Sequence, residues 1–248
     1  MAGKKERQRR LARERYQRRL SRQAQRTRRT RQWTVIGGVA VIVIGLAVGG
    51  AVVAARSLAT PTVQCTYTKS GTAARKVNLP PSTADPSATY QATIKTNRGS
   101  IVIDLLNNNA PCTVNSFMSL ANQAYFNKTP CHRLTTAGSL YVLQCGDPTG
   151  TGSGGPGYKF DNENLKGATY KQGTVAMANS GANTNGSQFF LVYKNSTLSA
   201  SYTPFGTIVS GINIIQNVAK AGSNNANGQG DGAPKEKVEI ESVIIKQT

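Results

Sequence analysis

The distribution of apolar and polar positions changes sharply along the chain, and its first feature is a long uncharged run. No charged residue occurs from Gln32 to Ala55, where valine, isoleucine, alanine, glycine and leucine predominate. A run of this length allows one helix to cross the roughly 30 Å apolar core of a bilayer. Trp33 stands at the charged end, where an aromatic ring suits the membrane interface. The pattern predicts a transmembrane helix over residues 32–56; a buried core helix would be shorter and interrupted by polar positions.

The remainder of the chain has the pattern of short strands with two helices. Residues 90–106 alternate apolar and polar positions around a glycine-containing turn, which predicts a β-hairpin. Residues 110–126 begin with Ala-Pro and carry apolar side chains at helical spacing, and residues 211–222 form a second such segment that ends at a glycine. Alternation returns in residues 238–247. This order favours a closed β-barrel capped by two helices, which leaves no exposed sheet edge.

Charge and composition divide the first third of the chain further. The net charge is +19, and residues 1–31 hold 14 of the 30 lysines and arginines with only two acidic residues. So dense a positive charge predicts a disordered basic arm. The leading interpretation of this arm is a topology signal and solvated tail, and the second is a segment that binds anionic lipids. Nucleic acid is not expected as a partner, because nothing downstream resembles a nucleic-acid module. Residues 57–89 are rich in Ser, Thr, Ala and Pro and are interpreted as a spacer. A globular domain then occupies residues 90–248.

The predicted topology sets the compartment. The positive-inside rule places the basic arm in the cytoplasm and everything after Arg56 outside the cytoplasmic membrane. A cleavable secretory signal fits less well, because both the basic and the apolar regions are too long; cleavage after Ala59 stays an alternative. The sequence therefore predicts a single-pass membrane protein with an extracytoplasmic domain.

Four cysteines fall in that domain and its spacer: Cys65, Cys112, Cys131 and Cys145. An oxidising compartment allows up to two disulfides, and three pairings are possible. Cys131 and Cys145 bound one predicted hairpin, but Cys112 is an equally plausible partner for either, so the pairing stays open. There is one histidine, His132, and no CxxC pair, so no metal site is expected.

Three segments carry a resemblance to a known family. They are CHRLTTAGSLYVLQCGDPTGTGSGGPGYKF (131–160), GTVAMANSGANTNGSQFFLVY (173–193) and YTPFGTIVSG (202–211). The first resembles the histidine–arginine strand, the following turn and the glycine-rich loop of the cyclophilins, and the second resembles the most recognisable signature of that family. The three segments occur in the order that a cyclophilin requires, and the whole chain resembles a membrane-anchored, actinobacterial-like form. The resemblance implies a closed eight-stranded antiparallel barrel capped by two α-helices and preceded by the transmembrane helix. It also implies peptidyl-prolyl cis-trans isomerase activity on proline-containing polypeptides, without a cofactor.

The reaction explains why such residue types belong together. A peptide bond before proline prefers trans by only about 0.5–1 kcal/mol, but its rotation barrier is about 18–20 kcal/mol because amide resonance is lost. A catalyst must hold the proline ring in an apolar pocket and donate a hydrogen bond to the nitrogen of the twisted amide. By resemblance that donor is Arg133. His132 is expected to be structural, because rotation requires no proton abstraction.

The resemblance assigns the remaining site residues. Gln144 and Phe190 join Arg133 in the catalytic set, with Phe190 as the floor of the proline pocket and Gln144 orienting the guanidinium. The substrate-binding residues implied are Tyr141, Val142, Ala178, Asn179, Gln188, Leu198 and Tyr202, with the Ala178–Asn179 backbone pairing with the extended peptide.

Several positions depart from the family pattern. Cys131 replaces an aromatic residue, Val142 stands where methionine is common, Thr197 where cyclosporin-sensitive members carry tryptophan, and Tyr202 where many carry histidine. These departures predict weak inhibition by cyclosporin.

The leading hypothesis is an isomerase that assists the folding of exported proteins. The alternatives are a proline-peptide binding module or chaperone with little turnover, and an interaction protein acting through its basic arm.

Overall fold

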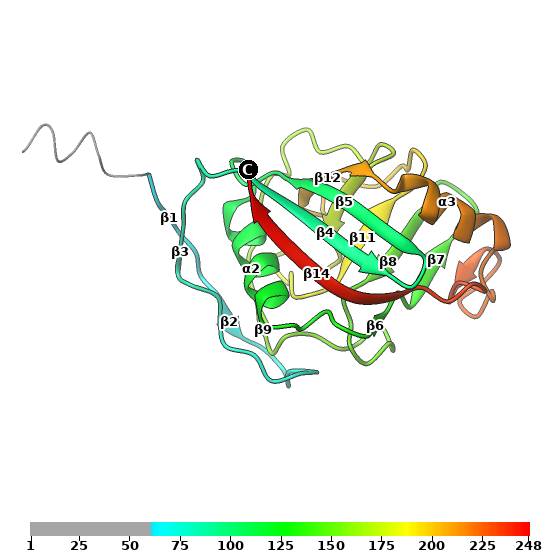
Figure 1. Cartoon of the computed structure of the whole chain (residues 1–248), viewed down its shortest axis with the longest axis horizontal. Helices are drawn as coiled ribbons and strands as arrows, with labels where there is room; N and C mark the ends of the chain where they lie inside the picture. The colour runs from blue at the N-terminus through cyan, green and yellow to red at the C-terminus, as the bar shows by residue number, and fades with distance from the viewer. Residues whose placement is uncertain (1–60) are drawn as a thin grey trace, which may run out of the picture. The chain divides into compact units, whose positions relative to one another are not determined.

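The structure is a computed structural model that describes residues 61–248, which form one compact unit (Figure 1). The predicted basic arm (1–31) and transmembrane helix (32–56) lie outside the described residues. The two helices within residues 61–248 have 12 and 10 residues, and neither is long and apolar enough to cross a membrane. This finding in residues 61–248 contradicts the predicted localisation as a single-pass membrane protein.

Most of the unit is one antiparallel sheet of ten strands in the order β13-β7-β8-β11-β10-β12-β5-β4-β14-β6. The predicted hairpin is confirmed as β4 (Tyr90–Thr96) and β5 (Gly99–Leu105), and the last alternating segment pairs with β4 as β14 (Glu239–Gln247). The other strands are β6 (Thr129–Pro130), β7 (Arg133–Thr135), β8 (Val142–Cys145), β10 (Thr174–Met177), β11 (Phe189–Val192), β12 (Pro204–Ser210) and β13 (Asp231–Gly232).

The mainly β class with two helices is confirmed, but the closed eight-stranded barrel is wrong. The sheet is a curled, open ladder, and the stretch from Thr129 to Thr135 supplies both β6, at one end of the strand order, and β7, next to the other end. Between them, Cys131 donates its backbone N–H to the carbonyl of Val238 (2.9 Å), which extends the register of β6 with β14 by one residue before the chain passes to β7. Because this connecting stretch is split into two short strands with different partners, the curl does not close into a continuous barrel.

The two helices lie at opposite ends of the sheet (Figure 1). α2 (Pro111–Asn122) begins with proline at its first turn and buries Val114, Phe117 and Leu120 against the core. Its N-cap residue, alanine, has no side chain able to cap, and the carboxylate of Glu163 accepts the N–H groups of Cys112 (3.1 Å) and Thr113 (2.7 Å) instead. The second helix, α3 (Ile212–Ala221), ends at a glycine as predicted.

Residues 61–89, which we call the strap, lie against the domain, in contrast to a free spacer. β1 (Val63–Gln64) pairs with β3 (Thr83–Ala84), and β2 (Thr68–Lys69) pairs with β9 (Tyr158–Lys159) of the glycine-rich region. The Tyr67 ring packs edge-on against Tyr158 and Phe160. The strap is therefore part of the same packed unit.

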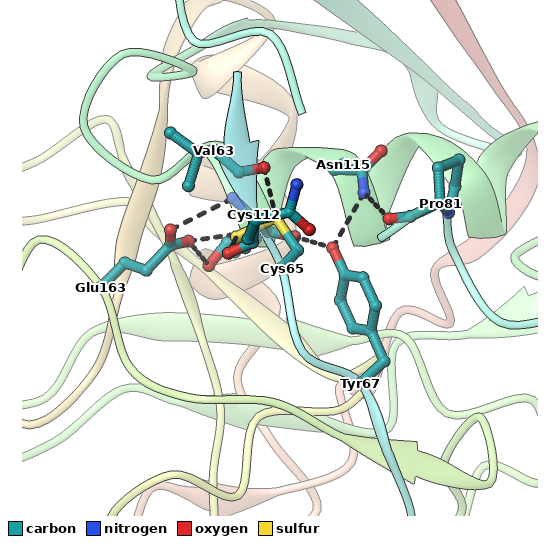
Figure 2. Close-up of a disulfide and its surroundings, with 9 residues drawn as sticks. Val63, Cys65, Tyr67, Pro81, Cys112, Asn115 and Glu163 are labelled. Carbon is teal, nitrogen blue, oxygen red and sulfur yellow. Dashed lines mark hydrogen bonds between the residues drawn. A yellow bond between two sulfur atoms is a disulfide. The ribbon is translucent and has the colours of Figure 1, made fainter. Parts of the chain in front are cut away.

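The structure settles the disulfide pairing as Cys65–Cys112 and Cys131–Cys145, so all four cysteines are bonded. Figure 2 shows the first bond, which joins the strap to the start of α2. Beside it the Tyr67 hydroxyl donates to the carbonyl of Cys112 (2.7 Å) and accepts from Asn115 (2.9 Å). Burial and the nearby Glu163 charge raise the pKa of Tyr67, so the phenol stays neutral and able to donate.

Candidate functional site

Arg133 lies on β7, opposite Gln144 on β8, and is held by an ion pair with Asp231 of β13. Its Nε donates to Oδ1 of Asp231 (2.8 Å) and its Nη2 to Oδ2 (2.6 Å). The remaining nitrogen, Nη1, lies 3.4 Å from Oε1 of Gln144. The bond from Arg133 lowers the pKa of Asp231, and the carboxylate in turn raises the pKa of Arg133. A bidentate pair fixes the plane of a guanidinium, so this arginine is oriented before any ligand binds.

A chain of amide side chains links Arg133 to the glycine-rich loop. The Nε2 group of Gln144 donates to Oε1 of Gln188 (2.9 Å). The Nε2 group of Gln188 then donates to the carbonyls of Gly152 (2.9 Å) and Gly154 (3.0 Å). The predicted polar residues Gln144 and Gln188 are thus brought together beside Arg133.

The apolar part of the site is a cluster separate from the main core. Phe190 and Val142 lie on the same face of the sheet, where β11 pairs with β8, and both are buried. Their neighbours Phe189 and Leu143 face the main core instead, because successive side chains along a strand point to opposite faces. The cluster comprises Val142, Tyr170, Ala176, Phe190 and Val192, with Leu140, Ala168, Ala178, Leu198 and Tyr202 partly buried against it.

Tyr202 closes one side of this cluster and is held by a residue that the sequence prediction missed. Its ring centroid lies 5.7 Å from that of Phe190. The Tyr170 hydroxyl donates to the carbonyl of Tyr202 (2.8 Å) and accepts from its N–H (3.0 Å). Since Tyr170 lies 32 residues earlier, in a segment without a motif, no sequence signal marked it.

Asp231 was also missed. It lies 98 residues from Arg133 in a glycine-rich stretch, and only the pairing of β13 with β7 brings it to the arginine. The sequence gives one signal for Asp231, namely that the chain has only 11 acidic residues.

The predicted peptide-pairing segment follows β10. The N–H of Ala178 already donates to the carbonyl of Gln188 (2.9 Å). The backbone of Asn179 makes no hydrogen bond within residues 61–248, while its side chain donates to the carbonyl of Ser201 (2.9 Å). The backbone of Asn179 therefore keeps its hydrogen-bonding groups free for an extended peptide.

Tyr141 does not join the site. Its neighbour Val142 faces the Phe190 cluster, so alternation turns Tyr141 to the opposite face. There its ring packs against Tyr193, with centroids 6.1 Å apart, and Nζ of Lys194 lies 4.4 Å above it.

His132 is half-buried, its two ring nitrogens are shielded from solvent, and neither nitrogen has a hydrogen-bond partner within the described residues. Burial lowers the pKa of His132, with Asp147 and Arg133 acting in opposite senses. It therefore sits neutral behind the site. Residues 61–248 contain no group of three or more His, Cys, Asp or Glu side chains able to hold a metal ion.

The site thus combines an arginine of fixed orientation, a buried cluster of aromatic and aliphatic side chains, and a chain of amide hydrogen bonds that leads to the glycine-rich loop. These features are typical of an enzyme that binds a peptide. Residues 91–245 match the family model described as cyclophilin type peptidyl-prolyl cis-trans isomerase, and the chain belongs to this family. The resemblance of the three motifs to the cyclophilin family is thereby confirmed, whereas the match over residues 91–245 says nothing of a membrane-anchored form.

Relatives and solved structures agree with this assignment. The chain is 50% identical over 200 residues to probable peptidyl-prolyl cis-trans isomerase B of Mycobacterium leprae, covering 74% of this chain and 67% of the relative. It is 47% identical over 188 residues to the protein of the same name from Mycobacterium tuberculosis, covering 70% and 60%. The chain thus spans about three fifths to two thirds of the length of these relatives.

Among solved structures, a cyclophilin type peptidyl-prolyl cis-trans isomerase of Cryptosporidium parvum superposes with a TM-score of 0.56 at 28% identity, covering 64% of this chain and 99% of the other. A second structure of that protein, determined in the presence of the dipeptide Ala-Pro, gives 0.55.

Proposed function

We propose that this chain catalyses cis–trans isomerisation of peptide bonds preceding proline in polypeptides. The observation that carries the proposal is the Arg133–Asp231 pair beside the Phe190 cluster. The proline ring occupies the apolar cluster, and the free edge of the guanidinium donates to the proline nitrogen as the amide twists. A planar amide nitrogen is a poor acceptor, so this bond forms only near the transition state and lowers the barrier. The solved relative crystallised in the presence of Ala-Pro supports proline peptides as the substrate class.

The remaining residues are proposed to position the peptide. Val142, Leu198 and Tyr202 complete the walls around Phe190, and the Asn179 backbone pairs with the extended chain. The hydrogen bond between Gln144 and Gln188 holds Arg133 and the glycine-rich loop in fixed positions relative to each other. No side chain is required to remove a proton, which agrees with a neutral His132 whose ring nitrogens have no hydrogen-bond partner within residues 61–248.

The test is catalysis of isomerisation in a proline tetrapeptide by the full-length, oxidised chain and its Arg133→Ala variant. Losing one transition-state donor typically costs about 10²–10³ in rate, so we expect a loss of at least about 100-fold. Arg98→Ala is the matched control, because Arg98 is a surface arginine paired with Glu236 at 3.0 Å, away from the proposed site. If the folded unsubstituted chain binds the peptide but does not accelerate exchange, the chain is a binding module instead.

We further propose that the clients are exported proteins that fold in an oxidising compartment. All four cysteines are paired, and paired structural cysteines are typical of proteins outside the reducing cytosol. Thiol trapping on the chain isolated from its native cells tests this. No alkylation without a reductant is expected, whereas full alkylation would refute it.

A further inference from the structure

Two walls of the proposed proline pocket, Leu198 and Tyr202, lie on the stretch between β11 and β12. We call residues 194–203 the wall segment. It contains no helix, its one strand-like pairing within residues 61–248 is the isolated bridge of Ser196 with Tyr170, and each of residues 194–202 is half-buried or exposed. A segment with so little regular structure and burial does not hold a fixed position by itself, so its anchors decide where the two walls lie.

Tyr170 anchors the wall segment near both of its ends. Near the start, the N–H of Ser196 donates to the backbone carbonyl of Tyr170 (2.9 Å). Near the end, the Tyr170 hydroxyl donates to the carbonyl of Tyr202 (2.8 Å) and accepts from the N–H of the same residue (3.0 Å). One residue therefore holds the segment by its backbone on one side of Leu198 and by its side chain on the other.

The neighbouring anchor of the segment does not reach the backbone of Tyr202. The N–H of Met177 on β10 donates to the carbonyl of Thr203 (3.0 Å), which fixes the residue that follows Tyr202. The N–H and the carbonyl of Tyr202 itself both bond to the Tyr170 hydroxyl and to no other group within the described residues. The position of the Tyr202 ring therefore depends on one phenolic hydroxyl.

Packing holds the Tyr170 ring in place. Its side chain belongs to the buried cluster, and the residue is only 2% exposed, whereas Tyr202 is partly buried against that cluster. The Tyr170 ring centroid lies 6.1 Å from that of Phe190 and 6.2 Å from that of Tyr202. Burial raises the pKa of Tyr170, so its hydroxyl stays protonated and able to donate at neutral pH. Because it is buried, Tyr170 acts on a ligand through the residues that it holds.

We propose that Tyr170 is a positioning residue that fixes the width of the proline pocket and so makes the pocket selective for a five-membered ring. This inference rests on the proposed isomerase function. A pocket with fixed walls discriminates against one extra methylene group by about 10–200-fold. A wall segment that is free to shift makes room for the larger ring and holds the smaller ring less tightly, so both affinity and selectivity fall.

The experiment compares two tetrapeptides as substrates of the full-length, oxidised chain. One has alanine before proline, and in the other the proline is replaced by pipecolate, its six-membered homologue. Each rate is expressed relative to the uncatalysed exchange of the same peptide. The unsubstituted chain should favour proline by at least about tenfold in kcat/KM.

Tyr170→Phe keeps the ring and removes only the hydroxyl. One hydrogen bond between neutral groups typically corresponds to a factor of about three to ten, so KM for the proline peptide should rise by about that factor and the preference for proline should fall by at least about threefold. The value of kcat should change by less than about twofold, because Arg133 is untouched and the walls bind ground state and transition state alike.

A matched control and a local readout assign the effect to the wall segment. Tyr158→Phe also removes a buried tyrosine hydroxyl, which bonds to Ser116 of α2 (2.8 Å), and should leave KM and the ring preference unchanged. In Tyr170→Phe, amide exchange at the N–H of Tyr202 should become faster. Exchange at the N–H of Ser196 should change less, because its bond to the Tyr170 carbonyl is kept.

A fall in kcat with KM and ring preference unchanged would overturn the positioning role of Tyr170, as would equal kinetics of Tyr170→Phe and the unsubstituted chain. Equal acceleration of both peptides by the unsubstituted chain would overturn the selectivity without any variant. The proline peptide separates these results from failure of the proposed function. If the unsubstituted chain does not accelerate its exchange, the isomerase proposal fails; if it does, only the inference about Tyr170 is at stake.

Discussion

Removing the Cys65–Cys112 disulfide should destabilise the whole unit rather than only loosen the strap. The perturbation is the paired substitution Cys65→Ala and Cys112→Ala, which leaves no unpaired thiol. The two cysteines are 47 residues apart in sequence, so the bond closes a long loop in the unfolded chain. In the chain-entropy model such a loop corresponds to about 4 kcal/mol of stability, compared with about 3 kcal/mol for the 14-residue separation of Cys131 and Cys145.

Urea unfolding of the full-length chain, followed by near-ultraviolet circular dichroism of the buried tyrosines, measures the change. A loss of about 4 kcal/mol corresponds to a fall in melting temperature of roughly 8–16 °C for a unit of this size. Amide exchange gives a second readout. The N–H groups of Ser70 and Ala74, which bond to the glycine-rich loop, should exchange faster in the variant than those of the β4–β5 hairpin.

A loss below about 1 kcal/mol would refute the loop-closure reasoning. Unchanged exchange at Ser70 and Ala74 would show that backbone pairing alone holds the strap. Isomerisation of an alanine-containing peptide should persist in the variant, because neither cysteine contacts Arg133, and that activity verifies that the variant still folds.

Four further outcomes are expected. Asp231→Asn should lower kcat about tenfold while KM changes little, because the neutral amide no longer fixes the plane of the Arg133 guanidinium. Steady-state kinetics measures both constants, and a rise in KM equal to the loss in kcat would argue against this positioning role. Burial keeps the folded-state pKa of His132 below its unfolded value of about 6.5, so the contribution of this group to the free energy of unfolding should be complete above that pH and should fall as the pH drops below it. His132→Leu should remove this slope, and NMR titration of the single histidine gives the pKa directly. Glu163→Gln should cost about 1 kcal/mol in thermal unfolding, because the α2 N-terminus keeps an acceptor but loses its charge. Cyclosporin should inhibit weakly because Thr197 replaces an aromatic residue, and tight inhibition in the peptide assay would contradict that expectation.

Local patterns predicted the elements of the fold well. The alternation in residues 90–106 and the helical spacing in residues 110–126 gave the β4–β5 hairpin and α2 close to their observed limits. Both signals are local, because the faces of a strand or helix repeat every few residues. Closure of the sheet was predicted wrongly, since it depends on how Thr129–Thr135 divides between partners far along the chain.

In the candidate site, too, the sequence predicted some residues correctly and others wrongly. The motif segments carried Arg133, Gln144, Gln188 and Phe190, and the structure brings all four together. Tyr141 was included although strand alternation turns it to the opposite face from its neighbour.

The sequence by itself determined the family, the strand and helix segments and the site residue Arg133, because each depends on a short run of neighbouring residues. Only the tertiary structure decided the disulfide pairing, the docking of the strap and the contacts of Asp231 and Tyr170. Four cysteines allow three pairings, and only proximity in space selects one. Contacts across tens of residues leave no periodic trace in the sequence, since they depend on which surfaces the folded sheet brings within a few ångströms.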